Sequence, residues 1–384
     1  MSTTTMILML ATATTALANP PLYELQFLGQ GFAGARMNSR GHVAGWVVPT
    51  QGPTRAHISF GGQTPVALPM PGAFVSSAAY DINDRGDAVG VVSMVSHPTL
   101  GSTTPVVWRR VAGGYEVHVL SPLQGDTVSY AIAINNFGDI VGGSGGIFGN
   151  SRGVLWTDAG PVNLTQLGSA AADINDHRVV LANQVLLDLD TMTTQTIDPP
   201  DRMSASGVQI NIQSNLVGTV ASYSSSCANF PARYLQGIGW EIMGGCSNSA
   251  SGNSINDLND VTSYYASTYA AWVHLEGEGD FGIAALVAPG QGAWYFQSSA
   301  QINNRRQIVI AGFDNNSTRR GAVLLSPIGM CRADYNGDGF VNGDDYDAFA
   351  EDFDEGWPGA DMNHDGFVNG DDYDAFSSAF DAGC

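Results

Sequence analysis

The chain is poor in positive charge. Its 384 residues include only 15 lysines and arginines against 36 aspartates and glutamates, which gives a formal net charge of −21. An acidic surface repels the phosphates of nucleic acids and the headgroups of anionic membranes, so the composition argues against both as partners. It favours solubility and cation binding instead.

Long apolar runs are also missing. After residue 18 no stretch reaches the eighteen or so apolar residues needed to span a bilayer. Residues 1–18 predict a signal peptide, because an apolar run from Met6 ends at Ala16-Leu17-Ala18, a small-residue cleavage pattern. The first five residues lack Lys and Arg, so a disordered Thr-rich leader is the alternative. We expect a secreted, extracellular or cell-surface protein.

Cysteines are few. The chain has four, none in a Cys-x-x-Cys pair, and four cysteines permit three pairings. Proximity in sequence favours Cys227 with Cys246 and Cys331 with Cys384. The alternative for Cys384 is covalent attachment to another molecule.

Residues 19–330 carry a repeated motif. Its clearest copy runs from Ala131 to Gly142, AIAINNFGDIVG, and the next clearest from Tyr80 to Gly90. An Ile or Met followed by Asn marks seven copies, with spacings of 45, 52, 40, 36, 45 and 47 residues. The seven motif asparagines are Asn38, Asn83, Asn135, Asn175, Asn211, Asn256 and Asn303.

The motif predicts a tight hairpin. An apolar strand ends before Asn, the Asn side chain can bond backbone in the turn, and Gly three positions later takes a left-handed conformation before the next strand. Four copies lack this Gly, and we expect those turns to differ. The residues in its place are Arg178, Ser214, Asn259 and Arg306.

About four short strands for each 36–52 residues, without helical periodicity, predict an all-β fold and a seven-bladed β-propeller. A stacked solenoid is the alternative. The pattern Ile-Asn-x-x-Gly-x-x-Val-Gly resembles the HAF-type extracellular repeat over about residues 23–327. The biochemical role of that family is largely unassigned, so the resemblance implies a fold and an extracellular location only.

Residues 331–384 contain two copies of one acidic loop. Asp334 to Asp345 returns 27 residues later as Asp361 to Asp372, with oxygen-bearing side chains at loop positions 1, 3, 5, 9 and 12 and Gly at position 6. This is the spacing of a calcium loop, in which position 7 contributes its backbone carbonyl. The predicted ligands of two calcium ions are Asp334, Asn336, Asp338, Phe340, Asn342 and Asp345, then Asp361, Asn363, Asp365, Phe367, Asn369 and Asp372.

Each loop is followed by an amphipathic run with aromatic residues at i, i+3 and i+7, which predicts one helix per loop. Two loop–helix units with Asp at position 12 resemble a type I dockerin, a module that binds cohesin domains of secreted scaffolds. Loop positions 10 and 11 hold Gly343-Asp344 and Gly370-Asp371 where cellulosomal dockerins carry hydroxyl residues. The resemblance therefore implies calcium binding and a cohesin-like or other cell-envelope partner. The ending Gly383-Cys384 resembles dockerin-like tails of secreted bacterial proteins that anchor or sort their cargo.

Catalytic signatures are weak. Two Gly-x-Ser-x-Gly matches surround Ser144 and Ser151, and a glycine pattern spans residues 277–282, but all lie between predicted strands in a Gly-rich chain. His364, at loop position 4, is expected to face away from the metal. Six aspartates near the motif turns are interpreted as turn formers: Asp81, Asp84, Asp87, Asp139, Asp173 and Asp176.

The sequence thus predicts a signal peptide (1–18), a propeller-like repeat region (19–330) and a dockerin-like calcium-binding region (331–384). We expect a non-catalytic surface or extracellular-matrix protein with no catalytic residue to name. The alternative is a propeller-type hydrolase or lyase that the tail delivers to polysaccharide. A glycan or protein ligand of the propeller is a further expectation.

Overall fold

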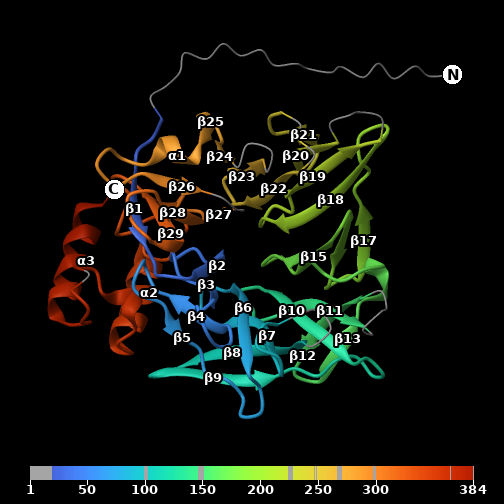
Figure 1. Cartoon of the computed structure of the whole chain (residues 1–384), viewed down its shortest axis with the longest axis horizontal. Helices are drawn as coiled ribbons and strands as arrows, with labels where there is room; N and C mark the ends of the chain where they lie inside the picture. Colours follow the sequence, from blue (N-terminus) through green and yellow to red (C-terminus); the bar gives the residue numbers. More distant parts are fainter. Residues whose placement is uncertain are drawn as a thin grey trace.

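The computed structural model describes residues 20–98, 103–145, 151–223, 228–245, 247, 249–265, 270–296, 300–363 and 365–383. The predicted signal peptide, Cys227, Cys246, His364 and Cys384 lie outside the described residues. The rest forms a ring of seven antiparallel sheets followed by two C-terminal helices (Figure 1).

Six blades each use four consecutive strands, with the first strand innermost. Blade 1 contains β2 (Phe32–Met37), β3 (Val43–Val47), β4 (Arg55–Ser59) and β5 (Val66–Ala67), and blade 2 contains β6 (Ser76–Ile82), β7 (Ala88–Ser93), β8 (Thr103–Val111) and β9 (Gly114–Val119). Blade 3 contains β10 (Val128–Ile134), β11 (Ile140–Gly145), β12 (Arg152–Thr157) and β13 (Gly160–Asn163), and blade 4 contains β14 (Asp173–Ile174), β15 (Val179–Ala182), β16 (Val185–Asp188) and β17 (Thr193–Thr196). Blade 5 contains β18 (Met203–Ile210), β19 (Leu216–Ser222), β20 (Asn229–Leu235) and β21 (Gly239–Ile242), and blade 6 contains β22 (Ala250–Ile255), β23 (Val261–Tyr265), β24 (Ala270–Leu275) and β25 (Gly279–Gly282). A 3-10 turn, η1 (Thr165–Leu167), follows blade 3, and the short helix α1 (Ile283–Leu286) follows blade 6.

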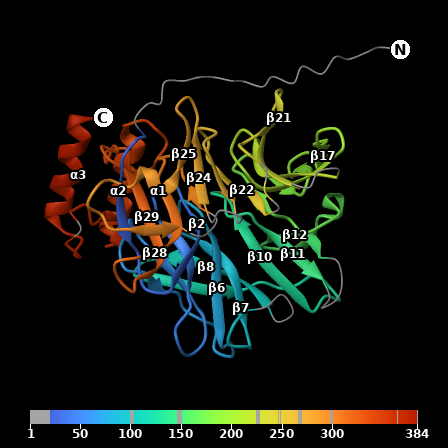
Figure 2. The same ribbon diagram turned by 45° about the horizontal axis from the view of Figure 1, so that its top comes forward.

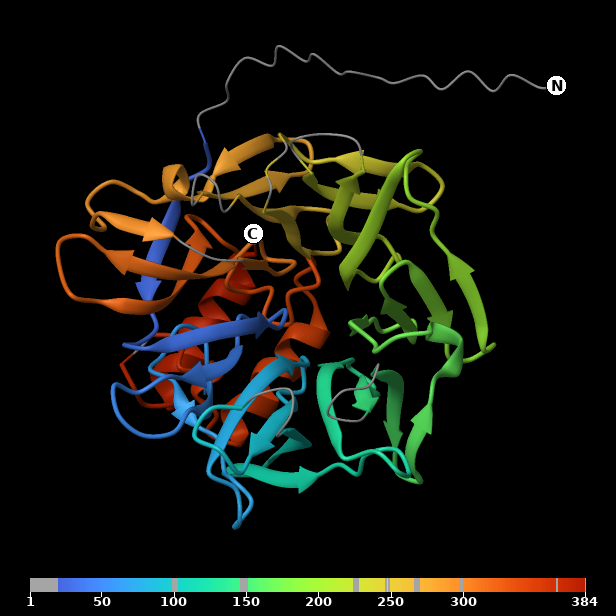
Figure 3. The same cartoon turned by 45° about the vertical axis from the view of Figure 1, so that its right-hand side comes forward.

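Blade 7 joins the two ends of the propeller. It contains β26 (Trp294–Phe296), β27 (Gln301–Ile302), β28 (Ile308–Asp314), β29 (Arg320–Pro327) and the N-terminal strand β1 (Tyr23–Phe27). Strand β1 pairs antiparallel with β29, from Tyr23 opposite Pro327 to Phe27 opposite Val323. Figure 3 shows the closed ring, which confirms the seven-bladed propeller and makes the solenoid alternative wrong.

Apolar layers fill the space between neighbouring blades. Ile58 and Trp108 belong to the layer between blades 1 and 2, while Val273 and Trp294 belong to the layer between blades 6 and 7. All four are buried. Burial of these alternating strand residues is the main force that holds each blade against the next.

The last Gly of the motif allows a bulge in the innermost strand. Pairing of the first two strands shifts register in blades 1, 2, 3, 5 and 6. A β-carbon on Gly45, Gly90 or Gly142 would lie 2.1 Å from a carbonyl oxygen of the bulged strand. In these three blades only Gly tolerates so close an approach, whereas blade 6 shifts register with Ser263 at the same position.

The motif asparagine closes each hairpin. In all seven copies its side-chain Oδ1 accepts a hydrogen bond from the backbone N–H four residues later, at 2.8–2.9 Å. All seven asparagines are 3–6 % exposed. The amide satisfies turn N–H groups that the ladder leaves unpaired.

The same seven amides link the blades. Each Nδ2 donates to the backbone oxygen of the motif Asn in the next blade, at 2.9–3.2 Å. The chain of bonds runs from Asn38 through Asn83, Asn135, Asn175, Asn211, Asn256 and Asn303, and returns to Asn38. A closed ring of seven hydrogen bonds therefore encircles the central channel.

The four turns without Gly do not differ from the others, so that expectation was wrong. Arg178, Ser214, Asn259 and Arg306 have φ between 58° and 66° and donate the same N–H to the motif Asn as the glycines do. A left-handed conformation costs a non-Gly residue about 1 kcal/mol or more.

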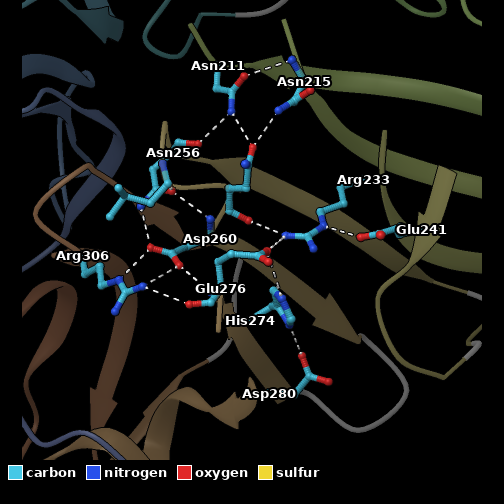
Figure 4. Close-up of polar contacts among 12 residues, drawn as sticks. Asn211, Asn215, Arg233, Glu241, Asn256, Asp260, His274, Glu276, Asp280 and Arg306 are labelled. Atoms are coloured by element: carbon cyan, nitrogen blue, oxygen red, sulfur yellow. Dashed lines mark hydrogen bonds and ion pairs between the residues drawn. The ribbon is translucent and has the colours of Figure 1, made fainter. Parts of the chain in front are cut away.

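Bonds to the preceding blade offset that strain. Nε of Arg306 lies 2.9 Å from Oδ2 of the buried Asp260 (Figure 4), and Nε of Arg178 lies 2.8 Å from Asp139. Asn259 accepts from Asn211 at 3.0 Å, and Ser214 accepts from Asn175 at 3.3 Å.

Replacing one ring asparagine tests its energetic role. In Asn83→Ala, the carbonyl of Asn135 and the N–H of Asp87 lose buried partners, so we expect the free energy of unfolding to fall by about 2–4 kcal/mol. Urea denaturation measures it. Asn316→Ala, at an exposed loop position, is the control and should change stability by less than about 0.5 kcal/mol. Equal effects of the two changes would contradict the ring's role.

Candidate metal centre and its contact with the propeller

The tail forms two loop–helix units, as predicted. Helices α2 (Gly343–Asp354) and α3 (Gly370–Ala382) follow the loops, and the 3-10 turn η2 (Pro358–Ala360) lies between the units. Neither helix is long and apolar enough to span a membrane, and no other described helix is. Figure 2 shows α2 and α3 beside each other at the rim of the ring, with α3 outermost.

The aromatic faces of the two helices pack together. Phe349 and Phe376 stack with ring centroids 4.1 Å apart and planes 10° apart. Tyr346 contacts Phe380 from α3, and Phe353 contacts Tyr373. This reciprocal pairing shows that the helices run antiparallel about a pseudo-two-fold axis through the Phe349–Phe376 stack.

The two loops are folded alike. Position 12, Asp345 or Asp372, accepts hydrogen bonds from the backbone N–H groups of positions 3 and 9 at 2.9–3.1 Å. Position 1, Asp334 or Asp361, accepts from the position-6 Gly. Asp345 and Asp372 are fully buried. Because a carboxylate oxygen has two lone pairs, these bonds leave acceptor capacity for a cation.

The donor set fits a hard cation. Every side chain predicted to bind the metal ends in carboxylate or amide oxygen, the ligands that calcium prefers. Oδ1 of Asp334 is buried without a hydrogen-bond partner, and burial raises the pKa of this carboxyl group although Arg305 opposes the shift. Within the described residues no three His, Cys, Asp or Glu side chains are gathered closely enough to hold a metal by themselves. To hold a cation, each loop would use its Asn and backbone oxygens as well.

Phe340 and Phe367, at position 7, are each 71 % exposed. Their side chains point to solvent, in keeping with a role for the carbonyl alone. Cys331 takes part in a disulfide. Since the other three cysteines are outside the described residues, the two pairings stay predictions.

The first unit is fastened to the propeller through Asp352, a fully buried carboxylate on α2. Arg110 of blade 2 approaches Oδ1 at 2.7 Å, Arg40 of blade 1 approaches Oδ2 at 3.3 Å, and the Tyr335 hydroxyl donates to Oδ2 at 2.8 Å. Although burial opposes it, the charges of Arg40 and Arg110 and the hydrogen bond from Tyr335 hold the pKa of Asp352 below its ordinary value.

Trp357 adds an apolar anchor. Its ring packs against Phe60 of blade 1 and Tyr115 of blade 2, with centroids 5.6 and 5.5 Å away. The guanidinium carbon of Arg110 lies 4.3 Å from its centroid, within cation–π range. The ring is 6 % exposed, so the tail buries a large side chain in the propeller.

The first loop itself contacts the propeller. Ser39 Oγ donates to the carbonyl of Asn336 at 2.7 Å, and Arg305 donates to the carbonyl of Asp334. In the second loop Gln63 donates to Asp361 at 2.9 Å. Sequence reasoning missed all these contacts. One signal was present: Asp352 and Glu351 of the first unit correspond to Ala379 and Ser378 in the second.

The channel is lined by acidic and amide side chains, which bond one another or the backbone. Its cavity is about 180 Å³ and includes Asp81, Asp84, Asp173, Asp176 and Asp257. Asp84 and Asp176 bond the Asn136 amide, while Asp257 bonds that of Asn304. Asp87 and Asp139 lie outside it and pair with arginines.

Two of the channel aspartates face a single arginine. Arg36 of blade 1 crosses to Asp173 of blade 4, where Nη1 and Oδ1 are 2.8 Å apart. Burial raises the pKa of Asp81 to about 7, with Arg36 opposing the shift. Asp81 also accepts from the N–H of Ile134, so these groups link blades.

The Gly-x-Ser-x-Gly matches do not form a nucleophile elbow. Ser144 is buried inside strand β11 and donates to Asp126 at 2.7 Å. Ser151 immediately precedes strand β12. An elbow places its Ser between a strand and a helix, whereas in the described residues Ser144 lies within a strand and Ser151 is followed by one.

No protein-family model and no curated protein matches the chain. Among solved structures, it is similar to virginiamycin B lyase from Staphylococcus aureus, with 13 % identity over 79 % of this chain and 99 % of that one, and a TM-score of 0.47. A streptogramin B lyase matches at 12 % identity over 79 % and 98 %, with a TM-score of 0.49. YCF48 bound to D1 peptide matches at 13 % identity over 82 % and 99 %, with a TM-score of 0.42. The likeness concerns the propeller fold, which lyases and binding proteins share.

Neutralising Asp352 should release the first unit. Asp352→Asn leaves Arg40 buried without a counter-charge and leaves Arg110 with only the partly exposed Glu355, 3.0 Å away, so we expect the free energy of unfolding to fall by about 3–5 kcal/mol. Urea denaturation measures the loss, and limited proteolysis reports the loosened tail. Asp381→Asn, on the exposed surface of α3, is the matched control. A stable variant with a protected tail would show that this contact is dispensable.

Buried His42 should make the fold acid-sensitive. Burial lowers its pKa to about 3 from 6.5, so the imidazole stays neutral in the folded state while the unfolded chain takes up a proton below pH 6.5. Stability therefore falls as pH drops from 6.5 to about 4, with His42 contributing about 1.4 kcal/mol per pH unit. Urea denaturation at fixed calcium, compared with His42→Gln, checks this. An unchanged slope in the variant would contradict it.

Proposed function

We propose that the chain is an exported, non-catalytic surface protein of a bacterium. In this proposal two calcium ions order the tail, the first loop–helix unit fastens it to the propeller, and the second unit faces a partner in the cell envelope. The observation that carries the proposal is the duplicated loop, which repeats the same backbone hydrogen bonds to position 12 in both copies.

The chain's own residues account for the calcium sites. In each loop the side chains of positions 1, 3, 5, 9 and 12 and the carbonyl of position 7 would hold the ion, which supplies positive charge among acids that otherwise repel one another. The tail carries 15 acids and one Arg, so without cations its two helices are held together against a charge of −14. The partnerless Oδ1 of Asp334 supports a ligand in the first loop.

The dockerin resemblance supports a docking role for the second unit. Helix α3 lies at the outer edge of the molecule (Figure 1) and makes no hydrogen bond, ion pair or ring contact with the propeller in the described part of the chain. Its partner would be a cohesin-like or other envelope protein. A screen of the full chain for polysaccharide hydrolase or lyase activity tests the non-catalytic part of the proposal, and turnover of any substrate would overturn it.

Removing one ligand from each loop tests the calcium sites. Asp334→Ala with Asp361→Ala should abolish binding of two calcium ions in titration calorimetry. It should also abolish the calcium-dependent gain in stability. For each site this gain is about 2.7 kcal/mol when the free calcium concentration is a hundred times the dissociation constant of the site.

The matched control is Asp347→Ala with Asp374→Ala, which removes the same charge from equivalent exposed positions of α2 and α3. Calcium binding that survives the first pair of changes would refute the assignment. Retention of an envelope protein in calcium, lost both in chelator and in the loop variant, would support the docking role.

A further inference from the structure

A pocket of about 310 Å³ lies between blades 5 and 6, away from the tail and the channel. One wall is a face of blade 6, where side chains alternate along each strand. Val261, Ser263 and Tyr265 come from β23, and the residues opposite Val261 and Ser263 in β24 are His274 and Trp272. The other wall is Met243 to Gly245, just after β21 of blade 5.

Glycine keeps the pocket open. Gly245 lines it and has no side chain to fill it. A β-carbon on Gly245 would meet nothing within 4 Å, so a larger side chain there has open space to enter. The Tyr265 hydroxyl donates to the carbonyl of Met243 at 2.8 Å and so fixes one wall against the other.

The pocket offers an aromatic surface. Trp272 is 40 % exposed, unlike Trp108, Trp156, Trp294 and Trp357, which are buried. Val261 and Met243 make the adjacent lining apolar. An exposed indole next to an apolar lining can stack against a ligand ring that presents its C–H bonds on one face.

A hydrogen-bond acceptor stands beside the indole. Nδ1 of His274 lies 2.8 Å from Oδ1 of Asp280 (Figure 4). Because a carboxylate only accepts, Nδ1 carries the proton, and Nε2 of the neutral ring is then an acceptor. The nearest carboxylate oxygen to Nε2, Oε2 of Glu276, is 3.6 Å away and engaged with Arg233.

The surrounding charge excludes an acidic ligand. Asp280 and Glu276 lie at the rim of the pocket, and Glu241 of blade 5 pairs with the neighbouring Arg233. The formal net charge of the whole chain is −21. A ligand for this pocket therefore carries no negative charge, has an apolar face and donates hydrogen bonds from its edge.

We propose that this pocket binds a neutral sugar residue of a polysaccharide. The C–H face of the pyranose ring stacks on Trp272, and one hydroxyl donates to Nε2 of His274. The proposal goes beyond calcium binding and tail docking, because no residue of the pocket belongs to the loops or to their contacts with the propeller.

Affinity electrophoresis of the full chain tests the proposal, in gels that contain a mixed-linkage β-glucan, a galactomannan, a xyloglucan or polygalacturonate. We expect at least one neutral polysaccharide to retard the protein. Trp272→Ala should weaken the apparent affinity roughly tenfold or more, and His274→Ala should also weaken it. Gly245→Leu should block the pocket while leaving Trp272 in place.

Phe137→Ala is the control, because Phe137 is 68 % exposed on another blade. It should be retarded like the unmodified chain. Equal retardation of Trp272→Ala and the unmodified chain, retardation by polygalacturonate alone, or no retardation by any polymer would each overturn the proposal. Thermal unfolding of each variant confirms that it is folded. Calcium titration of the same samples reports separately on the loops.

Discussion

The structure depends on a side-chain amide that serves two neighbours at once. Each motif Asn uses its oxygen to close its own hairpin and its nitrogen to hold the next hairpin. Since every amide is buried, loss of the first bond leaves a buried N–H without a partner, and loss of the second removes one of the two hydrogen bonds that the next Asn carbonyl accepts. Apolar layers supply most of the attraction between blades, while the amide ring sets how the blades are oriented around the axis.

The two halves of the duplicated tail differ in how they contact the propeller. Its halves share the same loops and the same aromatic packing, but only the first half carries Asp352 and Trp357. Those residues fit arginines and aromatic rings of blades 1 and 2. The second half keeps alanine and serine where the first has acids, so its outer surface stays free of strong charge at those positions. Divergence of a few side chains thus separates an internal attachment from an outward-facing surface.

Local chemistry was readable from the sequence, whereas long-range partners were not. The Asn hairpins, the seven blades and the aromatic faces of α2 and α3 follow from short patterns, because turns and periodicities involve residues within a few positions. The bond from Asn83 to Asn135 joins residues 52 apart, and no local rule predicts it. Arg178 at a left-handed position was misjudged for the same reason, since Asp139, which offsets the strain, lies 39 residues earlier. The contact of Asp352 with Arg40 and Arg110 required the closed ring to exist.

Closure of blade 7 by β1 has a consequence for the order of assembly. Among the described strands, β1 pairs with β29 alone, near the end of the repeat region. In a chain synthesised from its N-terminus, β1 must therefore wait for its partner until the other blades have been made. The tail follows the repeat region and touches Ser39 and Arg40 of blade 1 as well as Arg305 of blade 7. It therefore links blade 1 to blade 7, the blade that the pairing of β1 with β29 completes.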